Sequence, residues 1–555
     1  MAKSIFAAKT IPVYRDWVIF LVVFGLIMVK YCAFGFQYWP QLDDYIQYHN
    51  YAQFYGQTWD TVTMLGMLAA RPLAGLADLF FWSNFFDHML LGVALVSLMY
   101  AASAVLLRRI FAKYFGTGIL FVIFLTLFPL VTEGTYWMSA STRIVTGLFF
   151  AVLASVFFVR WLEKKGNPLL SGGLFMIFQL LAYGFYEQVL VFSVTLILLL
   201  AFLERKNAGC RLWLCLWSIV AAGLYFIFTA AFSESLLYSG RIETVPLTSP
   251  YYWDVFFPEL ITQLKSAFFG GGFYILCKGF LRGMGLIVSE KLILFLLALL
   301  VLAVVLWQFS RSESRQVPAG TEVKVGTSLI IGILLALAPL APFFITANPW
   351  FSLRGTVLSM VGLSLVGDTL LRLLLAKISP KNNVAPIFAC IMAVVFVVAG
   401  ISEVADYRDT HNNDVKIARA VLTAVEEDDV ADMEIGILNI EPTYLSDQNF
   451  YYHEHIHGVT ESQWAFTGAL RCIGGNGSLQ SVTPLPTDPV YKSWNADVSR
   501  PENFDRLYYY DEGENAVIPV VAETLEEQRY CILTEDGDLL GTLWEEDGNG
   551  YFQKE

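Results

Sequence analysis

Two adjacent carboxylates and three arginines are the residues of this sequence best suited to chemistry. Asp43 and Asp44 stand side by side directly after an apolar run. Neighbouring carboxylates repel each other, so one raises the proton affinity of the other and makes it a suitable base. Arginine binds phosphate through paired N–H groups, and the candidates for this task are Arg71, Arg143 and Arg354. The set suits a reaction in which a hydroxyl loses a proton beside an anionic phosphate.

The elements that position these residues are expected to be membrane helices. Of the 555 residues, 56% are hydrophobic and 15% are charged, whereas a soluble protein carries about 25% charged residues. The apolar residues gather in runs long enough to cross a hydrocarbon core of about 30 Å. The sequence therefore predicts a polytopic α-helical membrane protein with about eleven spans, at 17–36, 88–107, 117–132, 143–160, 169–186, 188–203, 212–232, 287–309, 327–345, 355–375 and 383–403.

Basic residues mark every second connection between these spans. They precede the first span and follow the second, fourth, sixth, eighth and tenth, beginning with Lys3, Lys9 and Arg15. Because cytoplasmic loops carry an excess of Lys and Arg, this alternation predicts an N-terminus inside the cell and a tail outside it. The opposite segments, which include the two aspartates, are poor in bases and rich in acids and aromatics.

Charge divides the chain into two parts. From Ala405 onward there are 30 acidic and 9 basic residues, a net charge of −21, whereas the first 404 residues carry +8. We therefore expect a transmembrane domain at 1–403 and an acidic extracytoplasmic domain at 404–555. The acidic tail argues against nucleic acid as a partner, because phosphate binding needs basic patches.

The tail is expected to be a small α/β or α+β domain. We predict a helix at 411–427, short strands at IGILNI and YCILT, and a hairpin in EDGDLLGTLWEEDGNG, since Asp-Gly and Asn-Gly favour tight turns. Two of the seven cysteines, Cys472 and Cys531, lie in this part, where they could form a disulfide.

Two long external segments, 37–87 and 233–286, are apolar enough to form helices along the outer membrane interface. Within the second, FFGGGFYILCKGFLRG (268–283) is expected to dip into the membrane and return, or alternatively to form a twelfth span. A charge at the end of an apolar run is costly unless it lines a wet cavity or finds a partner. The ionisable residues of separate external segments are therefore expected to converge in one cavity.

The chemistry that uses such a cavity is transfer of a sugar from a lipid phosphate. The donor would present an anionic leaving group at the membrane surface, where Arg or Lys stabilises the developing charge. The acceptor hydroxyl would need a carboxylate to take its proton.

Four short motifs lie on the external segments: LDDYIQYHNYAQFYGQTWDTVTMLGMLAARPLAG (42–75), EGTYWMSASTRI (133–144), YGFYEQ (183–188) and NPWFSLRG (348–355). Together they resemble the GT-C superfamily of polyprenyl-phosphate-sugar glycosyltransferases, and most closely its bacterial branch of O-antigen and wall-polysaccharide glucosyltransferases. The resemblance covers about residues 15–403. It has two departures, since Ala70 stands where a glycine is expected and the tail is larger than the family requires.

The resemblance implies an inverting transfer of a glucose-like hexose at the outer face of the bacterial plasma membrane. The donor would be a sugar linked to polyprenyl phosphate, held among the membrane lipids, and the acceptor a surface glycan. The resemblance implies no nucleotide sugar and no obligatory cytoplasmic cofactor. No metal ligands are assigned, but adjacent aspartates with a distant glutamate could hold a divalent cation, Mg or Mn, against the phosphate, as in some members of the superfamily.

The resemblance also implies roles for particular residues. Asp44, slightly favoured, or Asp43 would be the base. The lipid phosphate would be bound by Arg71, Arg354, Arg143 and Lys278. The sugar and the acceptor would be bound by Glu133, Tyr136, Trp137, Glu187 and Tyr45.

Structural explanations compete with these roles. One aspartate could cap a helix that begins near Tyr45, Arg71 could merely precede a helix opened by Pro72, and Glu187 could cap a turn. Arg354 could anchor its span at the interface, and Lys278 could reach toward lipid headgroups. Other functions also remain open: a polymerase or ligase of lipid-linked glycans, which takes an oligosaccharide donor, and a non-enzymatic transporter or flippase of a lipid-linked saccharide. Charges are scarce in the middle of the spans, which counts against a transporter.

Overall fold

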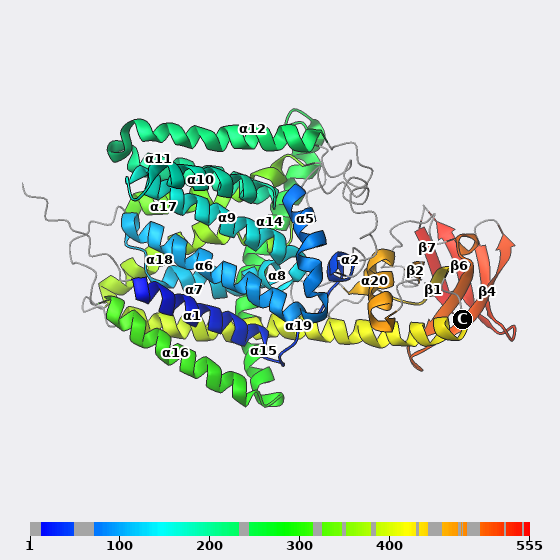
Figure 1. Cartoon of the computed structure of the whole chain (residues 1–555). Helices are drawn as coiled ribbons and strands as arrows, with labels where there is room; N and C mark the ends of the chain where they lie inside the picture. Colours follow the sequence, from blue (N-terminus) through cyan, green and yellow to red (C-terminus); the bar gives the residue numbers. More distant parts are fainter. Residues whose placement is uncertain are drawn as a thin grey trace, which may run out of the picture. The chain divides into compact units, whose positions relative to one another are not determined.

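The computed structural model describes residues 13–48, 71–231, 244–314, 325–346, 351–378, 384–428, 432–441, 458–475, 479, 481–485, 500–526, 529–546 and 549–554. These residues are mainly helical up to position 428, and a seven-stranded sheet follows (Figure 1). The chain divides into two units. The first is Met1–Tyr38, Trp59–Ala77 and His88–Val404, and the second is Trp39–Thr58, Asp78–Asp87 and Ala405–Glu555. The loop that carries the paired aspartates therefore belongs with the acidic C-terminal part, whereas the sequence places it in the domain 1–403.

Long apolar helices that lie side by side dominate the first unit (Figure 1). Nine helices of the described residues are long and apolar enough to cross a membrane, as expected of a multi-pass membrane protein. They are α6 (Met89–Phe115, preceded by η2, Trp82–His88), α9 (Met138–Leu162), α11 (Glu187–Ala208), α12 (Leu216–Ala230, preceded by η4, Gly209–Cys215), the composite helix Tyr252–Ser289, α16 (Ile293–Ser314), α17 (Val325–Leu337, followed by η7, Ala338–Phe344), α18 (Ser359–Ile378) and α19 (Val384–Asp428).

Seven further helices among the described residues complete this unit. They are α1 (Val13–Tyr31), α5 (Pro72–Phe80), α7 (Ile119–Leu127), η3 (Pro129–Val131), α8 (Thr132–Tyr136), α10 (Pro168–Tyr183) and η8 (Leu353–Thr356). The pair formed by α7 and Pro129–Tyr136 is bent by 50° and makes a tenth span if it is counted as one. Phe128, between them, takes φ −58° and ψ 130°, because a residue before proline avoids the helical region.

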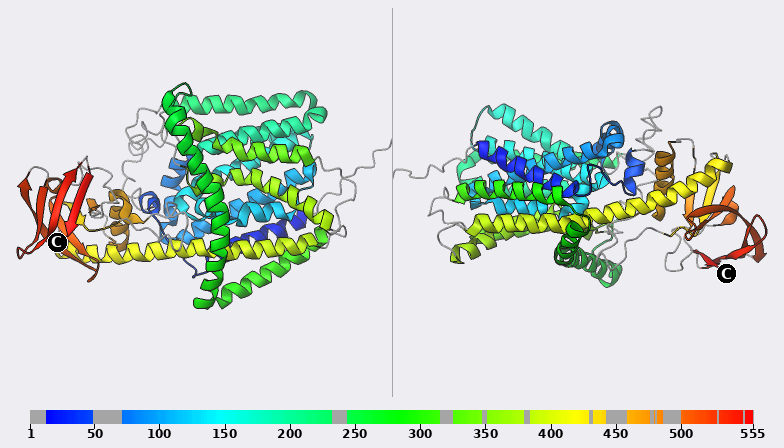
Figure 2. Two further views of the ribbon diagram at one scale, coloured as in Figure 1. Left: turned by 180° about the vertical axis from the view of Figure 1, so that it is seen from behind. Right: turned by 90° about the horizontal axis from the view of Figure 1, so that it is seen from below.

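The composite helix Tyr252–Ser289 differs from the others in direction. It consists of η5 (Tyr252–Phe256), α14 (Phe257–Lys265), η6 (Ser266–Tyr274) and α15 (Ile275–Ser289), and it runs across the other helices of the first unit rather than along them (Figure 2). The segment is helical as expected, and its position along the membrane interface stays a prediction. The return loop expected at 268–283 is wrong, because these residues are continuously helical.

One side of α15 is packed closely against α19 of the same unit. Gly279 and Gly283 lie on that side, and a Cβ at Gly283 would be 2.0 Å from the carbonyl oxygen of Val398. Two glycines four residues apart allow such an approach of two helix backbones. Large side chains are exposed elsewhere on the composite helix, including Phe273 of η6 and Leu281 of α15.

The second unit combines helices with a mixed sheet. Its strands are β1 (Glu434–Leu438), β2 (Ser481–Leu485), β3 (Arg506–Asp511), β4 (Ala516–Glu526), β5 (Arg529–Thr534), β6 (Leu539–Glu546) and β7 (Asn549–Lys554), in the order β2-β1-β3-β4-β5-β6-β7. β1 pairs in parallel with β2 and β3, and the other pairs are antiparallel. Helix α20 (Gln463–Gly474) lies between β1 and β2 in the chain, so this part is an α+β domain. The expected tight turn at Asp536-Gly537 is present between β5 and β6, and Gly537 takes φ 88°.

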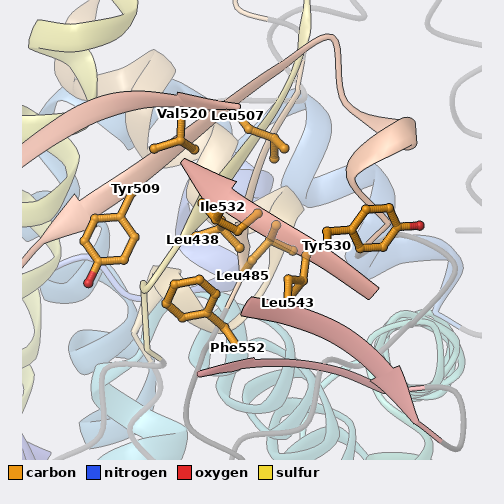
Figure 3. Packing of buried hydrophobic residues seen from close by; sticks show 9 residues of the cluster. All are labelled: Leu438, Leu485, Leu507, Tyr509, Val520, Tyr530, Ile532, Leu543 and Phe552. Carbon is orange, nitrogen blue, oxygen red and sulfur yellow. The ribbon is translucent and has the colours of Figure 1, made fainter. Parts of the chain in front are cut away.

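A hydrophobic core lies on one face of this sheet. It consists of Leu438, Leu485, Leu507, Tyr509, Val520, Tyr530, Ile532, Leu543 and Phe552 (Figure 3). The rings of Tyr509 in β3 and Phe552 in β7 are 5.9 Å apart at their centroids, although three strands separate β3 from β7 in the sheet. The sheet must therefore be strongly twisted and coiled, because neighbouring strands are rotated relative to one another.

Two expectations about the tail have different outcomes. The helix expected at 411–427 is confirmed, but it is continuous with the last predicted span, because α19 runs without a break over 45 residues from Val384. Cys472 and Cys531 are both free thiols, so the disulfide considered for them is not formed.

Candidate functional site

The junction of two helix starts places Arg71 beside Glu187. Arg71 directly precedes α5, and Glu187 is the first residue of α11. The backbone amides of Leu73 and Ala74 both donate to the carbonyl oxygen of Gly184, at 2.9 and 3.2 Å. A Cβ at position 184 would lie 2.5 Å from Cγ of Leu73. Glycine therefore allows the first turn of α5 to rest on the turn before α11.

Two contacts fix the guanidinium of Arg71. Its Nε donates to both carboxylate oxygens of Glu187, at 2.9 and 3.0 Å, and its Cζ lies 4.2 Å from the ring centroid of Tyr186. The side chain is 28% exposed. Within the described residues, no acceptor engages the two terminal nitrogens of Arg71. As far as the described residues go, the arginine is therefore held in place with its two terminal nitrogens unused.

The surrounding charges keep Arg71 protonated. Burial acts to lower its pKa, but Glu187 and Tyr186 outweigh burial, and the pKa of Arg71 is raised above its ordinary value. Arg143, on α9, is close enough to oppose this effect. Two cations thus lie near one carboxylate, which favours binding of an anion.

A second arginine is stacked on an aromatic side chain. Arg354 lies on η8, and its Cζ is 5.0 Å from the ring centroid of Trp137. Trp137 is 5% exposed, and its Nε1 has no acceptor within the described residues. A buried indole N–H is normally hydrogen-bonded, so this donor is available to a ligand oxygen. Glu133, one turn before Trp137, is also buried.

Gln188 connects α11, whose first residue Glu187 holds Arg71, with the element that carries Arg354. Its Nε2 donates to the carbonyl oxygens of Gly355, at 3.2 Å, and of Pro339, at 3.1 Å. The first turn of α11 therefore rests on η8. The first unit thus gathers on neighbouring elements five of the predicted residues, which are Arg71, Arg143, Arg354, Trp137 and Glu187.

Tyr136 and Lys278 have different surroundings. Tyr136 is fully buried, and its ring lies between those of Tyr31 and Tyr38, with centroids 4.9 and 5.0 Å away. It therefore packs the interior of the unit in this structure. Lys278 lies on α15, and its Nζ is 5.5 Å from the ring centroid of Tyr274.

The paired aspartates open helix α2 (Asp43–Tyr48) in the second unit. The backbone N–H of Gln41 donates to Oδ2 of Asp44 at 3.0 Å, and the N–H of Asp44 donates to the carbonyl of Gln41 at 2.7 Å. Asp44 is fully buried, whereas Asp43 is partly exposed. The helix-start explanation therefore accounts for the carboxylate of Asp44, which satisfies an amide at the beginning of the helix.

Tyr45 is buried beside a histidine that the sequence did not single out. Its hydroxyl lies 3.3 Å from Nδ1 of His411. Burial, followed by Asp414, Cys472 and Asp44, raises the pKa of Tyr45 well above its ordinary value. The phenol therefore stays neutral. No sequence signal pointed to His411, because it is 366 residues further along the chain, in a polar stretch.

Parts of the predicted motifs lie outside the described residues, namely 49–70 of the first motif and Asn348, Pro349 and Trp350 of the last. Across the described ranges, no group of three or more His, Cys, Asp or Glu side chains is arranged to hold a metal ion.

Comparison with protein-family models, with curated proteins and with solved structures finds no match to this chain. A function has therefore to be argued from the residues themselves.

Proposed function

We propose that this chain is a membrane glycosyltransferase that moves a glucose-like hexose from a polyprenyl-phosphate donor to a surface glycan. The observation that carries the proposal is Arg71, which Glu187 and Tyr186 hold while its two terminal nitrogens have no acceptor within the described residues. A pre-positioned pair of N–H groups matches a phosphate, which accepts two parallel hydrogen bonds. Arg143 adds a second positive charge.

The position of Arg71 in its helices favours a phosphate that is carried by a lipid. Arg71 precedes the first turn of α5, and its partner Glu187 begins α11, a helix long enough to cross a membrane. The ends of such helices lie at the depth of the lipid headgroups. A lipid-linked donor would present its phosphate at that depth.

In the proposed reaction, the oxygen of an acceptor hydroxyl bonds to the anomeric carbon of the donor sugar. The bond between that carbon and the phosphate oxygen breaks, and its electron pair leaves with the polyprenyl phosphate. Arg71 and Arg354 stabilise the charge that develops on the phosphate. The hydroxyl proton passes to Asp43 or Asp44. Attack on the face opposite the phosphate inverts the anomeric configuration.

The two aspartates differ in their suitability as the base. Asp44 is fully buried and accepts a hydrogen bond from the amide of Gln41, whereas Asp43 is partly exposed. Asp43 is therefore the better placed of the two to meet an acceptor hydroxyl, and Asp44 is the better candidate for shaping the loop.

The test is an assay of the purified protein in lipid nanodiscs with polyprenyl-phosphate-glucose, related donors and a surface glycan. We expect acceptor-dependent release of polyprenyl phosphate. Arg71→Gln should lower kcat/KM by about 10- to 100-fold, because hydrogen bonds to charged groups contribute about 1.5–3 kcal/mol. Arg205→Gln is the matched control, since Arg205 is exposed in the last turn of the same helix α11 that begins with Glu187.

Two outcomes would contradict the proposal. Absence of turnover with every monosaccharide donor would exclude this reaction, and turnover of a lipid-linked oligosaccharide instead would indicate a polymerase or ligase. Equal activity of Arg71→Gln and the unmodified protein would remove Arg71 as a phosphate ligand.

A further inference from the structure

The loop before α2 is tied to the polar half of α19 within the second unit. The side-chain Nε2 of Gln41 donates to the carbonyl oxygen of Tyr407 at 2.9 Å. His411 lies one turn further along α19, and its ring centroid is 5.7 Å from that of Trp39. Its Nδ1 is 3.3 Å from the carbonyl oxygen of Pro40. Three consecutive residues of the loop thus contact two positions of one helix.

The chemistry of these atoms decides which ring nitrogen of His411 carries a proton. The carbonyl of Pro40 can only accept a hydrogen bond, so Nδ1 must be the donor. The hydroxyl of Tyr45, also 3.3 Å from Nδ1, then accepts from the same N–H. The single proton on Nδ1 is therefore shared between the Pro40 carbonyl and the Tyr45 hydroxyl, which lie on either side of both aspartates in the chain.

The backbone of this loop needs such an anchor. Leu42, directly before Asp43, has φ 31°, which lies in the left-handed region that a leucine avoids. A residue persists in this region only where its surroundings hold it there. On the other side of the loop, α20 adds a packing contact, since a Cβ at Gly468 would be 3.2 Å from Cβ of Tyr45.

We propose that His411 is a positioning residue of the transfer reaction, which fixes the loop Trp39–Tyr45 and its two aspartates through Nδ1–H. The inference rests on the proposed function, because it assumes that one of these aspartates accepts the proton. It gives the C-terminal part of the chain a role in the reaction: α19 and α20 hold the carboxylates that the first external loop supplies.

The experiment compares two substitutions at one position. Asparagine can place an amide N–H where His411 has Nδ1–H, but it has no counterpart of Nε2, whereas alanine removes both. We expect His411→Asn to keep turnover within about 3-fold, and His411→Ala to lower kcat about 100-fold, the loss that accompanies misplacement of a reacting group by about 1 Å. The KM for the lipid donor should stay unchanged in both. His88→Asn, at an exposed histidine of η2, is the control for the substitution itself.

Hydrogen exchange of the α2 amides gives a second readout that does not depend on activity. His411→Ala should accelerate exchange at residues 42–48, and His411→Asn should not. If the unmodified protein transfers no sugar, the proposed function fails and with it the catalytic part of this inference, but the exchange readout still decides whether His411 holds the loop.

Two results would overturn the role of His411. Unchanged kcat and unchanged exchange in His411→Ala would show that the loop needs no anchor. Loss of activity in His411→Asn equal to that in His411→Ala would show that Nε2, and not Nδ1–H, is the atom that matters.

Discussion

In the proposed reaction, Arg71 would act through the shape of its side chain as well as its charge. Its Nε bonds Glu187, and its two terminal nitrogens have no acceptor within the described residues. Lysine carries the same charge on a single nitrogen and cannot bond a carboxylate and a phosphate in this fixed geometry. Arg71→Lys is therefore expected to lower kcat/KM for the lipid donor by about 10-fold, the equivalent of one hydrogen bond of about 1.4 kcal/mol. The measurement is steady-state turnover against donor concentration.

Arg143→Lys is the companion variant for this prediction. Arg143 influences Arg71 through its charge, so the lysine should change kcat/KM less than the same substitution at Arg71. Equal losses in the two variants, or no loss in either, would show that charge alone binds the donor.

Substitution of Trp137 tests whether its indole N–H contributes to binding of the donor or only to the stability of the protein. It has no acceptor within the described residues, whereas Nε1 of Trp161 donates to the carbonyl of Arg211 at 3.2 Å. Trp137→Phe should lower kcat/KM by about 2- to 10-fold through loss of a hydrogen bond to the donor, worth about 0.5–1.5 kcal/mol. Trp161→Phe should lower the melting temperature and leave kcat/KM unchanged. The opposite pattern would show that Trp137 has only a packing role.

At the scale of elements, the contact between α15 and α19 depends on one glycine. A Cβ at Gly283 would lie 2.0 Å from the carbonyl oxygen of Val398, whereas nothing lies within 4 Å of a Cβ at Gly285. Gly283→Ala must therefore push the two helices apart, and overpacking of this kind costs about 1–3 kcal/mol. We expect a lower melting temperature in detergent for Gly283→Ala than for the unmodified protein.

Gly285→Ala tests whether that loss comes from the contact. Both substitutions lie in the same helix and add the same methyl group, so any change in helix propensity is shared. Gly285→Ala should melt at or slightly above the temperature of the unmodified protein, because alanine is favoured over glycine in a helix. A lower melting temperature in both variants would assign the effect to α15 itself.

The membrane helices could be predicted because length and apolarity are enough to specify them. An apolar run near 20 residues has to be helical in a bilayer, where no water satisfies its backbone groups. The same signal predicted the end of α19 wrongly. Apolar residues stop near 403, but the helix continues through ADYRDTHNND to Asp428, since a polar helix can be held by partners such as Gln41.

Across the whole molecule, the sequence could not predict which residues far apart in the chain contact each other. The motifs predicted that Arg71, Arg143 and Glu187 would come together, and the structure brings them together. Glu187, expected to bind the sugar or the acceptor, accepts hydrogen bonds from Arg71 in the structure. The motifs could not predict this pairing. The link between His411 and Pro40 joins residues 371 positions apart, and no pattern in a single sequence marks such a pair.

The orientation of the chain in the membrane follows from its charge and can be tested with two cysteine variants. The turn after β3 contains exposed Glu512, in the part that carries −21, and the turn after α9 contains exposed Lys165, one of the basic connections. If cytoplasmic loops carry the basic residues, Glu512 is outside the cell and Lys165 is inside. A membrane-impermeant maleimide should then label Glu512→Cys in intact bacterial cells, and Lys165→Cys only after permeabilisation.

Labelling of the unmodified protein sets the background in this experiment, because native thiols such as Cys277 are exposed. Reversed labelling would place the tail and the loop Trp39–Tyr45 in the cytoplasm, since both belong to the second unit. A base on that side could not act on a glycan at the cell surface. The same result would leave Arg71 intact as an anion ligand, so it would separate the binding of a lipid phosphate from the identity of the acceptor.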